Sequence, residues 1–171
     1  MKWKDLILDS FERVPEELEG ILKGLKKNDL DWQPHHECNS LGWTVWHLAR
    51  VQDAQIADLA GKEQVYLADM WYTKFKRSPD PKDTGFGDTA AEVAAFESPN
   101  AEVLLGYIRS TTDRSRRVVT SITPAKLSRI LDEPWFKPKP TIGVRLVSIL
   151  ADAHHHTGEA SYIRGLWKAK K

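Results

Sequence analysis

Near its C-terminal end the chain reads TIGVRLVSILADAHHHTGEASYIRGLW, which are residues 141–167. At about 100° per residue, Ile149 and Ile163 lie on the same side of a helix as His156. The segment therefore predicts a long amphipathic helix whose apolar face also carries a histidine. Because three histidines are consecutive here, no more than one or two of them can lie on that face.

Three further segments show helical spacing of their apolar residues, over about residues 3–25, 41–60 and 98–122. Pro15 lies inside the first pattern and is expected to kink or split that helix. The second begins after Ser40, a favourable N-cap, and stops at Gly61. Ser98 followed by a proline is the start signal of the third.

Residues 61–98 form a long connection between the second and third long helices. Shorter helices are expected at about residues 89–96 and 123–131. Four long helices with one such connection predict an all-α fold, a four-helix bundle with a long crossover between helices 2 and 3. The length of the chain fits a single domain over residues 1–171.

The composition argues against several classes of partner and site. With 25 Lys and Arg against 24 Asp and Glu, the net charge of +1 argues against a nucleic-acid partner. The single cysteine, Cys38, excludes an internal disulfide and a cysteine-rich zinc site, which suits a reducing, cytoplasmic location. We find neither a secretory signal nor an apolar run near the ~20 residues of a membrane span, so no membrane partner is expected.

Asp152 and His156 are the first candidate site residues. Residues at i and i+4 of a helix are neighbours, with Cβ atoms about 5–6 Å apart, so both side chains could reach one cation or simply bond each other. His47 is the leading candidate for a third ligand, because it lies mid-helix on a largely apolar face. Two imidazoles and a carboxylate suit Zn, Ni, Fe or Mn, and three protein ligands leave a position for water or substrate.

Other interpretations of the histidines stay open at this point. His155 and Glu159 are also spaced by four, and His155 could replace Asp152 as the third ligand if the helix is rotated. His35 and His36 fall in a predicted loop, where they can be solvated. A histidine on an apolar face can be a core residue with satisfied hydrogen bonds, and a run of three can be a weak surface metal trap.

Several further residues are candidates for a pocket around the metal. The indoles of Trp43, Trp46 and Trp71 could wall it or belong to the core. Arg50 could pair with Asp152 or with a bound anion, or it could lie at the surface. Glu159 could orient a ligand imidazole or be a carboxylate at the rim of the site. The four arginines between residues 109 and 117 are interpreted as a solvated helix face.

Four stretches of the chain, in this order, resemble the DinB/YfiT-like superfamily of metalloenzymes: NSLGWTVWHLAR at residues 39–50, Trp71 with Phe75, TGFG at 84–87 and HTGE at 156–159. The resemblance implies a four-helix bundle, often a homodimer, that holds a divalent metal ion through three side chains. It assigns two ligands to His47 and His156. Many members have histidine at the position of Asp152. One branch of the family has an acidic residue there, so Asp152 is kept as the third ligand.

The resemblance also implies an activity. Characterised relatives are transferases and isomerases that use low-molecular-weight thiols such as mycothiol or bacillithiol. We therefore expect a divalent-metal-dependent enzyme, a thiol S-transferase or a related metal-assisted hydrolase or isomerase, acting on a small electrophile with a thiol cosubstrate. The alternative is a non-catalytic, stress-associated bundle that binds a metal or small ligand structurally.

Overall fold

The computed structural model describes residues 1–170, which form helices and no strand. The predicted all-α class is confirmed. The long helices are α1 (Trp3–Leu22), α3 (Leu41–Ala60), α7 (Ala101–Ser121) and α9 (Ile142–Ala169). The short ones are α2 (Lys27–Leu30), α4 (Val65–Ala68), α5 (Trp71–Lys74), α6 (Ala90–Ala94) and α8 (Pro124–Leu127).

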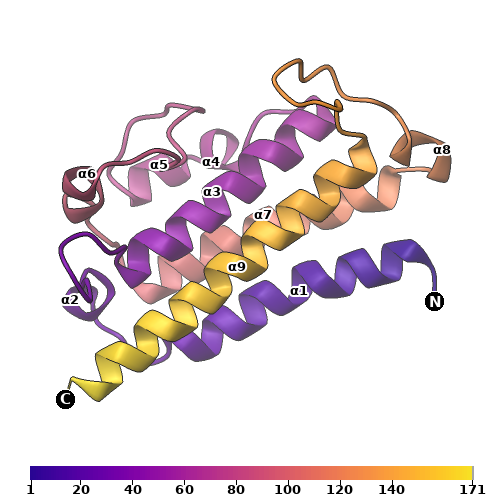
Figure 1. Cartoon of the computed structure of the whole chain (residues 1–171). Coiled ribbons are helices and arrows are strands. Elements are labelled where there is room, and N and C mark those ends of the chain that lie inside the picture. The colour runs from indigo at the N-terminus through magenta and orange to yellow at the C-terminus, as the bar shows by residue number, and fades with distance from the viewer. Residues whose placement is uncertain (171) are drawn as a thin grey trace.

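The long helices pack side by side, α3 and α1 each lying against both α7 and α9 (Figure 1). α1 and α9 run in one direction, while α3 and α7 run in the other (Figure 1). The chain therefore has to return along the whole length of α3 before α7 begins. Residues 61–100, which we call the crossover segment, make this return and contain α4, α5 and α6.

Local signals set the ends of α3 as predicted. The hydroxyl of Ser40 accepts a hydrogen bond from the backbone N–H of Trp43 at 3.2 Å. Gly61 follows the last turn with a φ of +59°, a left-handed conformation that glycine adopts without steric cost. α7 begins later than its start signal predicts, because the side chain of Asn100 caps it by accepting from Val103 N at 2.9 Å.

Two other expectations for the N-terminal part need correction. α1 continues through Pro15 without being split, and it ends at Leu22, three residues before the predicted end. The segment that follows was expected to be a loop, but it contains the single turn α2. A four-residue helix is too short to show periodicity in a sequence.

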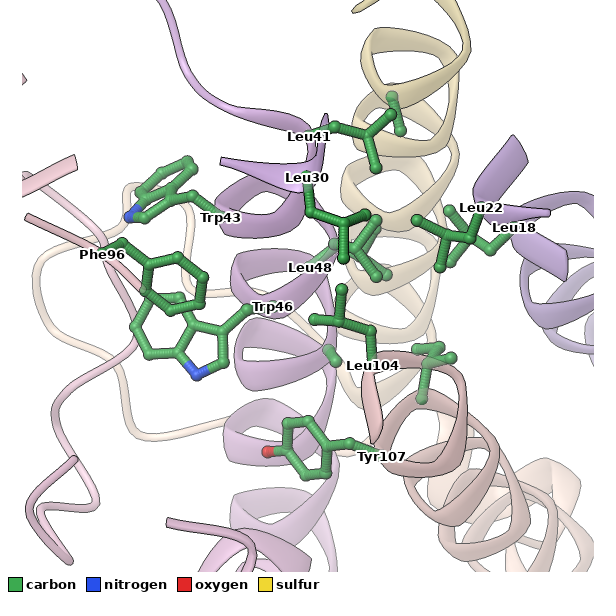
Figure 2. Packing of buried hydrophobic residues seen from close by; sticks show 14 of the residues in the cluster. Leu18, Leu22, Leu30, Leu41, Trp43, Trp46, Leu48, Phe96, Leu104 and Tyr107 are labelled. Carbon is green, nitrogen blue, oxygen red and sulfur yellow. The ribbon is translucent and has the colours of Figure 1, made fainter. Parts of the chain in front are cut away.

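A dense apolar core joins the long helices. Figure 2 shows leucines from four elements meeting there: Leu18 and Leu22 of α1, Leu30 of α2, Leu48 of α3 and Leu104 of α7. Most of α3 is buried, including the polar residues Thr44, His47, Arg50, Gln52 and Asp53, so this helix is the centre of the structure. No helix within residues 1–170 has the length and apolar character needed to cross a membrane.

Candidate metal centre

His47 lies in the first half of α3 and is 6% exposed. Its Nδ1 is 2.6 Å from the backbone carbonyl oxygen of Thr84 in the crossover segment. A carbonyl can only accept, so Nδ1 carries the proton and Nε2 keeps a free electron pair. The indole of Trp43 stacks on the imidazole, with centroids 4.7 Å apart and planes 10° apart.

Burial also sets the protonation of His47. It lowers the pKa of the imidazole, and the carbonyl of Thr84 offsets this shift only in part. The neighbouring His156 adds to the lowering, whereas the carboxylate of Asp152 opposes it. The neutral form is therefore favoured at neutral pH, and this is the form that binds a metal.

α9 contributes a second imidazole with the same arrangement. Nδ1 of His156 is 2.6 Å from Oε2 of Glu159, so this nitrogen donates to the carboxylate. Its Nε2 is 3.6 Å from Oδ1 of Asp152, whose side chain is about one-third exposed. In both histidines an oxygen therefore binds Nδ1, which leaves Nε2 available for a ligand.

The two imidazoles come together from separate helices. Their ring centroids are 4.8 Å apart and their planes meet at 84°. Donors that share one zinc-like ion at about 2.1 Å are separated by no more than about 4.2 Å. Within residues 1–170, donor atoms of His47, Asp152 and His156 are not all within 4.8 Å of one another, so binding requires a side chain to turn. The carboxylate of Asp152 is the least buried of the three candidate ligands.

The other two histidines of the run face elsewhere. Nε2 of His154 is 2.7 Å from the hydroxyl of Ser10 in α1. The side chain of His155 is 76% exposed, and its Nε2 is 3.6 Å from Oε1 of Glu159. The structure therefore directs His156 toward α3, and Glu159 contacts both His155 and His156.

A different group of donors meets the distance expected for one ion. One atom each from His35, His36 and Glu37 lie within 4.8 Å of one another, in the exposed loop between α2 and α3. The two rings are 4.0 Å apart. Nδ1 of His35 is already in contact with the backbone N–H of Glu37 at 3.3 Å. We call these three residues the loop cluster.

Arg50 lies one turn after His47 and is fully buried. Its Nε donates to the carbonyl oxygen of Asp83 at 2.9 Å, and its Nη1 donates to the phenol oxygen of Tyr107 at 3.2 Å. Asp83 directly precedes Thr84, so Arg50 holds the part of the crossover segment that binds His47. A surface position for Arg50, which the sequence also suggested, is wrong, and the contact with Asp83 was not predicted.

Gly85 allows the crossover segment to lie directly on α3. It has a φ of +80°, and an added Cβ would be 2.9 Å from both Trp43 and Trp46 and 3.1 Å from Nδ1 of His47. Only the resemblance to a family singled out the surrounding TGFG stretch, and no role was assigned to it. Asp88, which accepts from the indole N–H of Trp43 at 3.0 Å, carried no signal in the sequence.

The three candidate tryptophans have different surroundings. Trp43 borders His47, as described above. Trp46 is fully buried between Phe96, at 5.1 Å, and the guanidinium of Arg77, at 4.6 Å. Trp71 is half-buried and packs on Tyr107 at 5.4 Å. Of the three, Trp43 is therefore the indole in direct contact with a candidate ligand.

Comparison with known proteins identifies the family. The model of the DinB superfamily matches residues 10–160, so the chain belongs to the DinB superfamily. A conserved protein of Enterococcus faecalis has a crystal structure with a TM-score of 0.90 to this chain and 28% sequence identity. The match covers 99% of each chain. No curated protein matches.

Proposed function

We propose that the chain is a metal-dependent enzyme. We also propose that its four long helices form a four-helix bundle with a crossover. The observation that carries this proposal is the pair His47 and His156. They come from separate helices, and their ring centroids are 4.8 Å apart. Nδ1 of each ring is in contact with an oxygen. With Nδ1 of each ring bound to an oxygen, Nε2 of each ring is the nitrogen left to bind a metal ion.

The donor set fits a divalent cation. His47 and His156 would hold it with Asp152, two neutral nitrogens and one carboxylate that suit Zn, Ni, Fe or Mn. A cation bound there would favour the deprotonated, nucleophilic form of a water or thiol. The chain itself fixes the ligands, since Thr84 and Glu159 accept the Nδ1 protons. Trp43 shields one face of His47 from water.

We infer that the substrate approaches from the side of α9. Asp152 and Glu159 are 34% and 39% exposed in their side chains, whereas His47 is buried, so the centre opens at α9. The reaction that we propose is transfer of a low-molecular-weight thiol to a small electrophile, or a related metal-assisted hydrolysis or isomerisation. Family membership supports the metal, and the choice of thiol chemistry rests on the resemblance alone.

Elemental analysis of untagged protein tests the metal. We expect close to one equivalent of a transition metal per chain. Less than about a tenth of an equivalent, in protein purified without a chelator, would contradict the proposal. The loaded protein is then incubated with an electrophile and with each of several cellular thiols. Loss of thiol that depends on the metal and on His156 supports the transferase. A full metal complement without turnover would favour the non-catalytic alternative.

We also propose that the chain forms a homodimer. Light scattering coupled to size-exclusion chromatography measures the mass in solution directly. A mass near twice 19.5 kDa supports it, and a mass near 19.5 kDa contradicts it.

A further inference from the structure

A hollow lies at the end of the helices opposite to the candidate metal centre. It has a volume of about 940 Å³ and is formed by the end of α3, the C-terminal half of α7, α8 and the start of α9. In Figure 1 this is the end beside α8. Gly61 lines it, roughly 20 Å along α3 from His47 at 1.5 Å per residue.

Positive charge is concentrated around this hollow. Its lining has two carboxylates, Asp58 and Asp69, and five cationic side chains: Lys62, Arg114, Arg117, Lys126 and Arg129. The whole chain, by contrast, has a net charge of only +1. We call this hollow the basic cleft. Cations that surround a concave site raise the local concentration of anions.

The arginines of α7 divide into two groups. Arg109 and Arg116 form ion pairs at 2.8 Å with Glu19 and Glu12 of α1. Arg114 and Arg117 line the basic cleft instead. Arg109, Arg116 and Arg117 are exposed, as expected for a solvated helix face, and Arg114 is half-buried.

Most cations of the basic cleft have no anionic partner among residues 1–170. Arg117, Lys126 and Arg129 make no ion pair with a carboxylate of residues 1–170. Nη1 of Arg114 donates to the backbone carbonyl oxygen of Glu63 at 3.1 Å, which leaves its other nitrogens available. Guanidinium groups in such positions are suited to bind phosphate through paired hydrogen bonds.

The lining also includes an apolar part. Val118, Ile122 and Ile142 are buried, at 9%, 5% and 3% exposure, and they line the same cleft. A volume near 940 Å³ falls within the range of small-molecule sites, about 300–1,000 Å³. We propose that the basic cleft binds a small organic phosphate, with its phosphate on the arginines and its apolar body on these aliphatic side chains.

A simpler explanation has to be separated from this one. Lys62 is the second residue after the end of α3, and Arg117 lies four residues before the end of α7. Cations near the C-terminus of a helix stabilise it without any ligand. That explanation predicts an effect of the arginines on stability but none on binding.

Calorimetric titration of the full chain with 1-naphthyl phosphate tests the proposal. The protein is treated with chelator first, so that no cation near His47 contributes. We expect saturable binding of one equivalent, with affinity at least tenfold above that of 1-naphthol, which lacks the anion, and of inorganic phosphate, which lacks the apolar body. Equal affinity for 1-naphthol, or no saturable binding, would overturn the proposal.

Two double variants locate the binding. Arg117→Gln/Arg129→Gln should weaken the binding of 1-naphthyl phosphate at least tenfold. Arg109→Gln/Arg116→Gln removes the same charge from arginines outside the cleft, and should change it less than twofold. Thermal melts of both variants confirm that they fold. The site is rejected if both variants weaken the binding of 1-naphthyl phosphate equally. It is also rejected if Arg117→Gln/Arg129→Gln lowers the Tm without weakening that binding. Tighter binding of a single-stranded oligothymidylate than of 1-naphthyl phosphate would reject it as well.

Discussion

The loop cluster and the candidate metal centre are two histidine groups of opposite construction. His35, His36 and Glu37 are consecutive, exposed, and within 4.8 Å of one another. His47 and His156 are more than a hundred residues apart and reach each other only through the packing of α3 on α9. The first group is closer to the distances of a metal site, but only the second is held by neighbouring oxygens and burial.

The difference concerns what holds the ligands in place. In the loop cluster, the backbone N–H of Glu37 occupies Nδ1 of His35, and exposed side chains lose rotational freedom when they bind. In the candidate centre, Thr84 and Glu159 already fix the rings of His47 and His156. We therefore expect specific binding at the helix pair and weak, adventitious binding in the loop.

Removal of a ligand should have the largest effect. His47→Ala and His156→Ala should each reduce metal affinity more than about 100-fold, because even partners outside the coordination sphere contribute 10–100-fold. Competition with a chromogenic chelator measures the change. The double variant His35→Ala/His36→Ala is the matched control and should retain the metal. Loss of the metal in the control alone would assign the site to the loop cluster.

Closing the space over His47 should have the next largest effect. Gly85→Ala places a Cβ 2.9 Å from two indoles, and we expect a loss of about 1–3 kcal/mol in the free energy of unfolding. Gly87→Ala is the control, because its φ of +86° is equally unfavourable for alanine but nothing lies within 4 Å. Urea unfolding of both variants isolates the steric part. Equal losses would show that the close approach does not matter.

Weakening the orientation of His156 should have a smaller effect. Glu159→Gln removes the negative charge that accepts the Nδ1 proton, and we expect about tenfold weaker metal binding. His155→Ala changes an exposed contact of the same carboxylate and should leave the affinity within about twofold. Chelator competition again provides the comparison. If His155→Ala has the larger effect, then His155 rather than His156 is the ligand of α9.

The smallest effect concerns pH. The folded protein lowers the pKa of His47 below its usual 6.5, so the unfolded chain takes up this proton first as the pH falls. The stability of the metal-free protein should therefore decrease as the pH falls below about 6.5, by less than 1.4 kcal/mol per pH unit from this residue. His47→Gln should flatten the slope. An unchanged slope in His47→Gln would show that this pH dependence does not come from His47.

Local signals explain why some elements could be predicted from the sequence. Ser40 and Gly61 act within a few residues of themselves, and α3 has the predicted bounds. The start of α7 was placed too early because Ser98 looks like an N-cap. In the structure its backbone N–H donates to Asp31, 67 residues away, and Asn100 caps the helix instead.

The same distinction holds for the candidate site. The spacing of Asp152 and His156 by four is a property of one helix, and the i, i+4 contact is present at 3.6 Å. The contacts of His47 with Thr84, and of Arg50 with Asp83, join residues more than thirty positions apart through an irregular segment. No periodicity describes such a segment, so these contacts could not be derived before the fold was known.

The stacking of Trp43 on His47 provides the molecule with an optical reporter. An excited indole loses emission to a protonated or cation-bound imidazole in contact with it, and these rings are parallel at 4.7 Å. Fluorescence from Trp43 should therefore fall when an ion occupies the position beside Nε2 of His47. Substitution of the other buried indole of α3, Trp46, should leave that quenching in place. Occupancy could then be followed in real time without a dye or a label.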